Sequence, residues 1–268
     1  MKTLYISDLD GTLLNQQARV SPFSIQAINA LMEQGLLFSY ATARSIVTAS
    51  QVTQGLEVKL PVIVHNGGFI RQPHRDEVVI GNYFGEEFHS ILSDLLNNEI
   101  FPLVYSLNDG KEKYRYWAEK QSKGMRKFLD SKENDPRDTP VHDADSLFAG
   151  RPYYITCIDA PERLVPFYEK YKDQVHCILY KEIYSGELWL EMMPKAASKA
   201  NAALQLKNLL GCDRLVVFGD GTNDLDLFRV ADEAYAMENA EEELKALATA
   251  VIGSNQEDGV ARWLLENA

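Results

Sequence analysis

Two short apolar runs, far apart in the chain, each lead into a pair of acidic residues. The first run, residues 3–7, leads into Asp8 and Asp10, and the second leads into Asp220 and Asp224. The strands of a parallel sheet present their carboxyl ends at one edge, so loops that are distant in sequence meet there. The two runs therefore predict strands of one parallel sheet, with their acidic loops gathered at the same edge.

Four carboxylates at one edge of a sheet need a cation among them. Two carboxylates about 4 Å apart repel each other by roughly 4 kcal/mol at an effective dielectric constant of about 20. A ligand set made of oxygen atoms alone favours a hard divalent ion, and we expect Mg²⁺. Because protein-bound Mg²⁺ commonly binds a substrate phosphate as well, this pattern indicates a protein that handles phosphate.

The first third of the chain alternates between strand and helix patterns. Strands are expected at 36–41 and 61–65, and helices are expected to begin at Ser21 and at about Ser45. A helix at 198–210 continues the alternation near the other end of the chain. The pattern predicts an α/β fold, a doubly wound, Rossmann-like parallel sheet with helices on both faces.

The pattern changes between residues 83 and 190. Asn108-Asp109-Gly110 lies between two strand-like runs and is a hairpin signal. Residues 131–146 are charged and contain prolines, so we expect a surface loop there. We therefore expect a catalytic core made of residues 1–82 and 191–268, interrupted by an inserted α+β domain of residues 83–190.

The overall charge limits the possible partners. The chain has 27 basic and 39 acidic residues, a net charge of −12, whereas binding to nucleic acid or to an anionic membrane needs a basic surface. The three cysteines share no short spacing, which argues against a disulfide framework or a zinc site and for a reducing compartment. No apolar stretch approaches the ~20 residues of a membrane helix. We expect a cytoplasmic protein that binds a small phosphorylated molecule; the sequence does not indicate its oligomeric state.

The acidic loops resemble the motifs of a known family. The first motif of the haloacid-dehalogenase superfamily is similar to Asp8-Leu9-Asp10-Gly11-Thr12. Thr42 resembles the second motif, Lys199 the third, and Gly219-Asp220-x-x-Asn223-Asp224 the fourth. Their order, and the large insertion between motifs two and three, resemble the Cof-type phosphatases. The resemblance implies a hydrolase of phosphoric monoesters, with a cap domain that closes over the carboxylates.

The resemblance also implies a role for each matched residue. Asp8 would be the nucleophile that forms an aspartyl phosphate, and Asp10 would be the general acid and base. The substrate phosphate would be bound by side chains and backbone amides of Leu9, Thr42, Ala43, Lys199 and Asn223. Mg²⁺ would be bound by Asp8, Asp10 (through its backbone carbonyl), Asp220 and Asp224.

Several of these residues also have simpler interpretations. Thr42 could cap the helix that follows it, and Lys199 could be a solvated lysine in a first helical turn. Lys195 is a rival to Lys199 for the role of the site lysine. Asn223 and Asp224 could be the cap and first-turn acid of the next helix.

Two further expectations concern side chains outside the motifs. Arg44 is expected to pair with a carboxylate, in preference to contacting substrate. The large aromatic residues of the inserted domain could line a cover over the site, but we favour packing in that domain's own core. These residues are Tyr114, Tyr116, Trp117 and Trp189.

Our main interpretation is a Mg²⁺-dependent phosphatase for small phosphorylated metabolites, such as sugar phosphates. One alternative is a phosphosugar mutase of the same superfamily, which would return the phosphate to its sugar. Another is a receiver-type signalling module, which also gathers acidic residues, a threonine and a lysine around Mg²⁺. In a receiver the phosphorylated aspartate follows a middle strand, whereas here the paired acids open the chain.

Overall fold

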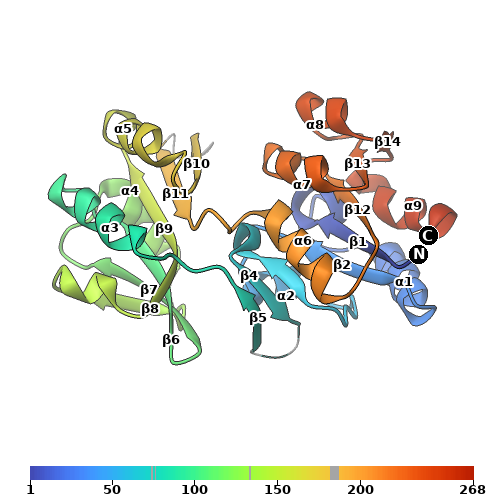
Figure 1. The fold of residues 1–268 in the computed structure, drawn as a ribbon, viewed down its shortest axis with the longest axis horizontal. Helices are drawn as coiled ribbons and strands as arrows, with labels where there is room; N and C mark the ends of the chain where they lie inside the picture. The colour runs from blue at the N-terminus through green and yellow to red at the C-terminus, as the bar shows by residue number, and fades with distance from the viewer. Residues whose placement is uncertain (74, 76, 133, 182–186) are drawn as a thin grey trace. The chain divides into compact units, whose positions relative to one another are not determined.

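The structure is a computed structural model, which describes residues 1–73, 75, 77–132, 134–181 and 187–268. The chain divides into two compact units (Figure 1). The first consists of Met1–Gly81 and Ala197–Ala268, and the second of Asn82–Ala196. The second junction lies beyond the expected residue 190, because strand β11 (Leu188–Met193) belongs entirely to the second unit.

The first unit is built on an 8-stranded sheet in the order β14-β13-β12-β1-β2-β3-β4-β5. Its strands are β1 (Thr3–Asp8), β2 (Leu37–Ala41), β3 (Val62–Val64), β4 (Phe69–Gln72), β5 (Glu77–Gly81), β12 (Arg214–Gly219), β13 (Glu233–Met237) and β14 (Ala250–Ile252). All neighbours from β14 to β3 are parallel, whereas β4 and β5 extend the sheet in antiparallel pairing. The sequence analysis predicted the parallel part and did not predict β4 or β5.

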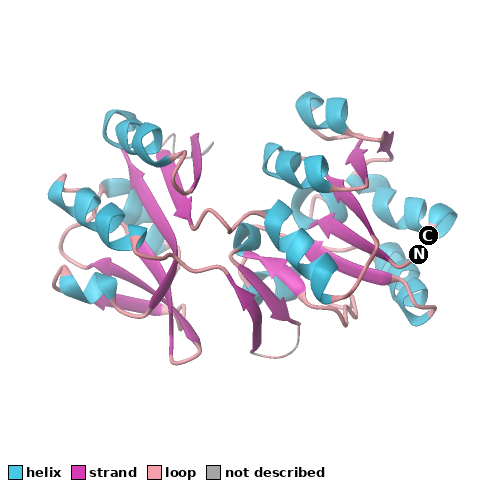
Figure 2. Cartoon of the chain, viewed as in Figure 1, coloured by secondary structure: helices cyan, strands magenta, loops and turns pink. Residues whose placement is uncertain are grey.

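Helices flank this sheet (Figure 2). They are α1 (Pro22–Glu33), α2 (Ile46–Val52), α6 (Lys199–Leu209), α7 (Leu225–Val230), α8 (Glu242–Leu247) and α9 (Gly259–Asn267). Serines start three of them: the side chains of Ser21, Ser45 and Ser198 each accept a hydrogen bond from a backbone N–H in the first turn. Helix α1 packs on α9, and α6 packs on α7.

The central strands of the first unit are buried along almost their whole length. Leu4 and Ile6 of β1, and the run of residues 215–218 in β12, are all 0% exposed. Strands of a parallel sheet are covered on both faces, which is why they read as continuous apolar runs. Each such side chain contributes about 1.5–3 kcal/mol when it is removed from water. The core therefore fixes the strand ends that carry the acidic loops.

The second unit has a 6-stranded sheet in the order β10-β11-β9-β6-β7-β8. Its elements, besides β11, are α3 (Glu87–Asn97), β6 (Leu103–Asn108), β7 (Lys111–Trp117), α4 (Lys123–Asp130), β8 (Asp138–Val141), β9 (Arg151–Asp159), α5 (Pro161–Tyr171) and β10 (His176–Lys181). The hairpin predicted at Asp109-Gly110 is confirmed, since both residues have positive φ and join the antiparallel strands β6 and β7. The surface loop predicted at 131–146 is wrong in part, because β8 pairs with β7 in parallel.

The second unit has its own hydrophobic core. One cluster includes Phe88 and Leu92 of α3, Leu164 of α5, and apolar residues of β6, β9 and β11. A smaller cluster around Met125 of α4 contains Tyr114, and two more of the four aromatic residues considered above, the partly buried Tyr116 and Trp189, pack against it. The fourth, Trp117, packs edge-on against the ring of Phe101. The expectation that these rings pack within their own domain is confirmed.

Across the described ranges of the chain, none of the helices combines the length and the apolar character needed to cross a membrane.

Candidate active site

Three carboxylates from distant parts of the chain converge at the carboxyl edge of the first sheet. Asp8 ends β1, Asp220 directly follows β12, and Asp224 precedes α7. Because β1 and β12 are adjacent and parallel, their ends lie side by side. One carboxylate oxygen from each residue lies within 4.8 Å of those of the other two. The sheet thus produces the convergence of acidic loops that the sequence predicts, through these three side chains.

Lys199 lies among these carboxylates. Its Nζ donates to Oδ1 of Asp8 at 2.6 Å and to Oδ1 of Asp224 at 2.7 Å. The residue is 3% exposed, so the interpretation of Lys199 as a solvated lysine is wrong. Lys195, its rival in the sequence, is exposed and donates to the backbone carbonyl of Asp173. Ser198 caps α6, so Lys199 is the first residue of that helix.

The charges of this cluster are not balanced by the protein alone. Burial raises the pKa of Asp8 to about 8, against the effect of Lys199, and the charge of Asp224 raises it further. Burial also raises the pKa of Asp220 to about 6. For Lys199, burial lowers the pKa, but the charges of Asp224 and Asp8 outweigh it, so the net shift is upward. One ammonium faces three carboxylates, and this all-oxygen set fits a divalent cation such as Mg²⁺.

Asp224 also holds the loop that bears Asp220. Its Oδ2 accepts hydrogen bonds from the backbone N–H of Asp220 at 3.2 Å and of Gly221 at 3.4 Å. Asp224 stands at the N-cap position of α7, not within its first turn, and its side chain makes no capping hydrogen bond to that helix, so the interpretation of Asp224 as a first-turn acid of α7 is wrong. Its other carboxylate oxygen binds Lys199. Asn223, the proposed cap residue, is exposed.

Gly11 and Thr12 bring the first acidic loop against Asp220. Gly11 has φ +80, and a Cβ at this position would lie 2.0 Å from Oδ2 of Asp220. The close approach therefore requires glycine. The Thr12 hydroxyl donates to Oδ1 of Asp220 at 3.0 Å, which orients that carboxylate. The sequence analysis gave Thr12 no role, although its place directly after Asp10-Gly11 is the available signal.

Asp10 lies outside the cluster of three carboxylates. Its side chain is 52% exposed and pairs with Arg44, whose Nε and second terminal nitrogen donate to the two carboxylate oxygens at 2.8 Å and 2.6 Å. The prediction that Arg44 pairs with a carboxylate is confirmed. The expectation for metal binding concerned the backbone carbonyl of Asp10, which is independent of this side-chain contact.

Thr42 follows β2 and is fully buried. Its Oγ1 accepts a hydrogen bond from the backbone N–H of Arg44 at 3.1 Å. Thr42 does not cap α2, because Ser45 does so. Of the other residues expected to bind phosphate, Leu9 is buried, whereas Ala43 is exposed beside Thr42. Leu9 directly follows β1, and Thr42 and Ala43 directly follow β2, at the carboxyl edge of the sheet.

Two asparagines near the C-terminus hold the loop that contains Asp10. The Asn239 side chain donates to the backbone carbonyl of Gly11 at 2.8 Å and accepts from the backbone N–H of Asn255 at 3.0 Å. The Asn255 side chain donates to the carbonyl of Leu14 at 2.8 Å. Sequence reasoning missed both residues, because nothing in a single sequence connects positions more than 220 apart.

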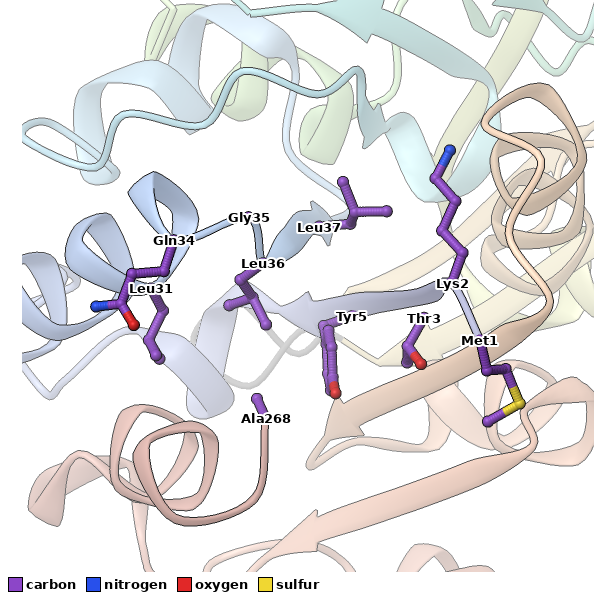
Figure 3. A pocket seen from close by; sticks show the side chains of 10 residues that line it. All are labelled: Met1, Lys2, Thr3, Tyr5, Leu31, Gln34, Gly35, Leu36, Leu37 and Ala268. Carbon is purple, nitrogen blue, oxygen red and sulfur yellow. The ribbon is translucent and has the colours of Figure 1, made fainter.

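A pocket of about 480 Å³ lies elsewhere in the first unit (Figure 3). Its lining includes Met1, Thr3, Gln34 and Leu37, at the start of the chain and around the beginnings of β1 and β2. Parallel strands begin at the opposite edge from their carboxyl ends, so this pocket is separate from the carboxylates.

The sheet, the loops that carry Asp8, Thr42 and Asp220, and the buried Lys199 are features of one class of hydrolases. Residues 5–264 match the haloacid dehalogenase-like hydrolases, and the chain belongs to this family. It is similar to two Bacillus subtilis proteins named 5-amino-6-(5-phospho-D-ribitylamino)uracil phosphatase, YwtE and YitU. YwtE is 28% identical, over 98% of this chain and 97% of its own, and YitU is 25% identical, over 97% and 95%.

A solved structure shares the whole fold. The X-ray structure of TM0651 from Thermotoga maritima has a TM-score of 0.80 and 25% identity, and the match covers 100% of this chain and 98% of that one. The predicted superfamily, α/β fold and phosphatase class are therefore confirmed. Membership in this family removes the receiver-type alternative.

Proposed function

We propose that the chain is a Mg²⁺-dependent phosphatase that hydrolyses small phosphorylated metabolites through an aspartyl phosphate on Asp8. One observation carries the proposal: the carboxylates of Asp8, Asp220 and Asp224 converge within 4.8 Å, beside the buried ammonium of Lys199. Such a cluster provides a nucleophile, ligands for a cation and a donor for phosphoryl oxygens. Phosphoryl transfer depends mainly on positioning and on stabilisation of charge, which these groups supply.

The proposed reaction has two displacements at phosphorus. In the first, an oxygen of Asp8 attacks phosphorus, the ester P–O bond breaks, and Asp10 gives a proton to the departing alcohol oxygen. In the second, Asp10 takes a proton from a water molecule whose oxygen attacks the same phosphorus. Phosphate leaves and the Asp8 carboxylate is restored. Asp10 suits the acid and base role because its side chain is 52% exposed and can exchange protons with solvent.

Other residues would bind the transferring group. Hydrogen bonds to the phosphoryl oxygens would come from Leu9 and Ala43 (backbone N–H), Thr42, Lys199 and Asn223. The protein ligands of Mg²⁺ would be Asp8, Asp10 (backbone carbonyl), Asp220 and Asp224. The ion would neutralise charge on the phosphoryl oxygens when bound.

The names of two relatives and the charge of the chain support the proposed substrate class. Two relatives are named for a phosphoribityl substrate, which favours sugar or polyol phosphates for this chain as well. The net charge of −12 disfavours nucleic acid and anionic membranes as partners. The three cysteines are free thiols, as is usual for an enzyme that acts in the reducing cytoplasm.

A phosphate-release screen tests this function. We expect release from sugar and polyol phosphates in preference to nucleotides, loss of release when EDTA removes the metal, and recovery when Mg²⁺ is added. A colorimetric assay of inorganic phosphate measures all three. Formation of an isomeric sugar phosphate without free phosphate would indicate the mutase instead, and release that is unaffected by EDTA would contradict the metal assignment.

Arg44 is expected to act as a positioning residue for Asp10. Replacing Arg44 with methionine should lower kcat by about 10²-fold, because a carboxylate displaced by about 1 Å loses its alignment with the leaving oxygen. Lysine at position 44 should recover part of this loss, since it keeps the charge but cannot bind both oxygens in a fork. Steady-state kinetics with separate kcat and KM values measure the effect.

Arg229 offers a matched control. It pairs with Asp226 across three residues of α7, and both side chains are at least half exposed. Arg229→Met should leave kcat and KM within about twofold, since exposed pairs contribute no more than about 1 kcal/mol. If Arg44→Met changed KM but not kcat, Arg44 would be a substrate-binding residue and the positioning role would be wrong.

A further inference from the structure

The loop that carries Asp10 contains a residue with unusual backbone freedom. Gly11 directly follows Asp10 and has φ +80, and its close approach to Asp220 leaves no room for a Cβ. Glycine has more accessible backbone conformations than other residues, so a loop that turns at glycine is easily displaced. A general acid must stay within hydrogen-bond reach of the oxygen that it protonates. A contact that restrains Gly11 is therefore needed to position Asp10.

The side chain of Asn239 provides this restraint. Asn239 follows β13, and its Nδ2 donates to the backbone carbonyl of Gly11 at 2.8 Å. Its Oδ1 accepts from the backbone N–H of Asn255 at 3.0 Å, so the amide group is held at both ends although the residue is exposed. The carbonyl that Asn239 holds belongs to the residue next to Asp10. The contact therefore fixes the backbone from which the Asp10 side chain extends.

The three clustered carboxylates have anchors of their own. Two of them bind the buried ammonium of Lys199. The third residue, Asp220, is also held through its backbone carbonyl, which accepts from the backbone N–H of Glu241 at 2.9 Å. None of these contacts uses the side chain of Asn239. Loss of that side chain is therefore expected to displace Asp10 and to leave the cluster in place.

We propose that Asn239 is a positioning residue for Asp10, and that its amide N–H keeps this acid aligned with the leaving oxygen. The inference rests on the proposed phosphatase function, in which Asp10 protonates the departing alcohol. Arg44 binds the carboxylate of Asp10, and Asn239 holds the backbone beside it. Asn239 on this basis affects the proton transfer without contacting the substrate.

Two esters with different leaving groups test this role. Ribitol 5-phosphate releases an alcohol whose oxygen must gain a proton, whereas p-nitrophenyl phosphate releases a weakly basic phenolate that needs none. Asn239→Ala should lower kcat/KM about 10-fold for ribitol 5-phosphate and less than about twofold for p-nitrophenyl phosphate. Because kcat/KM reports the cleavage of the ester bond, later hydrolysis of the aspartyl phosphate does not obscure the comparison. Initial rates of phosphate release measure both values.

Asn29 offers a matched control on α1. Its Nδ2 donates to the backbone carbonyl of Gly55 at 2.9 Å, and its Oδ1 accepts from the backbone N–H of Glu57 at 2.9 Å. Gly55 has positive φ, as Gly11 does. Asn29→Ala thus loses the same pair of hydrogen bonds, but neither is made to an acidic loop of the site. It should leave kcat/KM for both esters within about twofold.

Two further variants separate the positioning role from an effect on folding. Asn239→Asp keeps the acceptor oxygen and loses only the donor, and its charge acts alike on the two phosphate groups. It should therefore reproduce the selective loss with ribitol 5-phosphate. In a chain that already carries Asp10→Asn, Asn239→Ala should cause little further loss, because a residue that acts through Asp10 has no effect once that acid is gone.

Each outcome decides the question. An equal loss with both esters, or no loss with ribitol 5-phosphate, would overturn the proposal. A loss of the same size with and without the Asp10 carboxyl group would overturn it as well, because Asn239 would then act through another part of the site. Failure of the unmodified chain to release phosphate from either ester would overturn the proposed function itself, and this result needs no variant.

Discussion

Replacing Asp8 with asparagine is expected to reduce phosphate release by roughly 10⁴-fold or more while the chain remains folded. An amide oxygen cannot replace the carboxylate nucleophile, and losing a nucleophile removes most of the rate enhancement of comparable enzymes. Stability should be preserved, because Lys199 keeps its 2.7 Å contact with Asp224 and one of three crowded carboxylates is lost. Initial rates and thermal melting, measured on the same preparation, test both statements.

Asp226 provides the matched control for this substitution. It lies on α7, its side chain is 60% exposed, and it pairs with Arg229 across the helix surface. Asp226→Asn should retain activity within about twofold. Acid-quenched samples of the unmodified chain should gain the mass of one phosphoryl group during turnover, and Asp8→Asn should not. Retention of more than about a tenth of the activity by Asp8→Asn would show that another group is the nucleophile.

The convergence of the acidic loops could be predicted because it depends on topology alone. Once residues 3–7 and 215–218 are recognised as strands of one parallel sheet, their carboxyl ends must lie at one edge. The register confirms this, with Ser7 opposite Phe218 at the ends of β1 and β12. The same reasoning places Thr42 at the edge, after β2. The identity of Lys199 as the site lysine needed the family resemblance as well.

The side-chain partners within the site could not be predicted in this way. Asp8 and Asp10 are two residues apart, yet Asp8 binds buried Lys199 while the exposed Asp10 side chain binds the partly buried Arg44. The chain leaves the strand directly after Asp8, so the alternation of a strand no longer fixes the direction of Asp10. Contacts such as that of Asn239 with Gly11 depend on how separate loops meet, which a single sequence does not encode locally.

The short strand at the edge of the second sheet was also not predicted from the sequence. Strand β8 has the sequence Asp-Thr-Pro-Val, and it lies at the edge of its sheet. Aspartate and proline are typical of turns, and proline within a sheet is confined to edges, where one side of the strand needs no partner. The charged stretch around β8 therefore resembled a loop. Its pairing with β7 is a tertiary effect that outweighs the local preference.

Replacing Lys199 with methionine is expected to cost both stability and activity. The lysine side chain is 1% exposed and contacts Asp8 and Asp224, so its removal leaves buried carboxylates without their ammonium. Breaking such a pair on one side costs about 3–5 kcal/mol. Loss of a donor to the transferring phosphoryl group should lower kcat by roughly 10²–10³-fold. Thermal unfolding without metal, together with phosphate release at saturating Mg²⁺, measures the two effects separately.

The response to Mg²⁺ makes this prediction specific. Because a divalent cation would replace part of the missing positive charge, Mg²⁺ should raise the melting temperature of Lys199→Met more than that of the unmodified chain. Two lysines serve as controls: Lys207, which lies on the same helix as Lys199 and pairs with Asp232, and the exposed Lys195. Lys207→Met and Lys195→Met should lose no more than about 1 kcal/mol of unfolding free energy and should retain their kcat.

If Lys195→Met lost activity and Lys199→Met did not, the site lysine would be misassigned. If all three variants melted alike and Mg²⁺ had no effect on any of them, the charge imbalance inferred for the carboxylate cluster would be wrong.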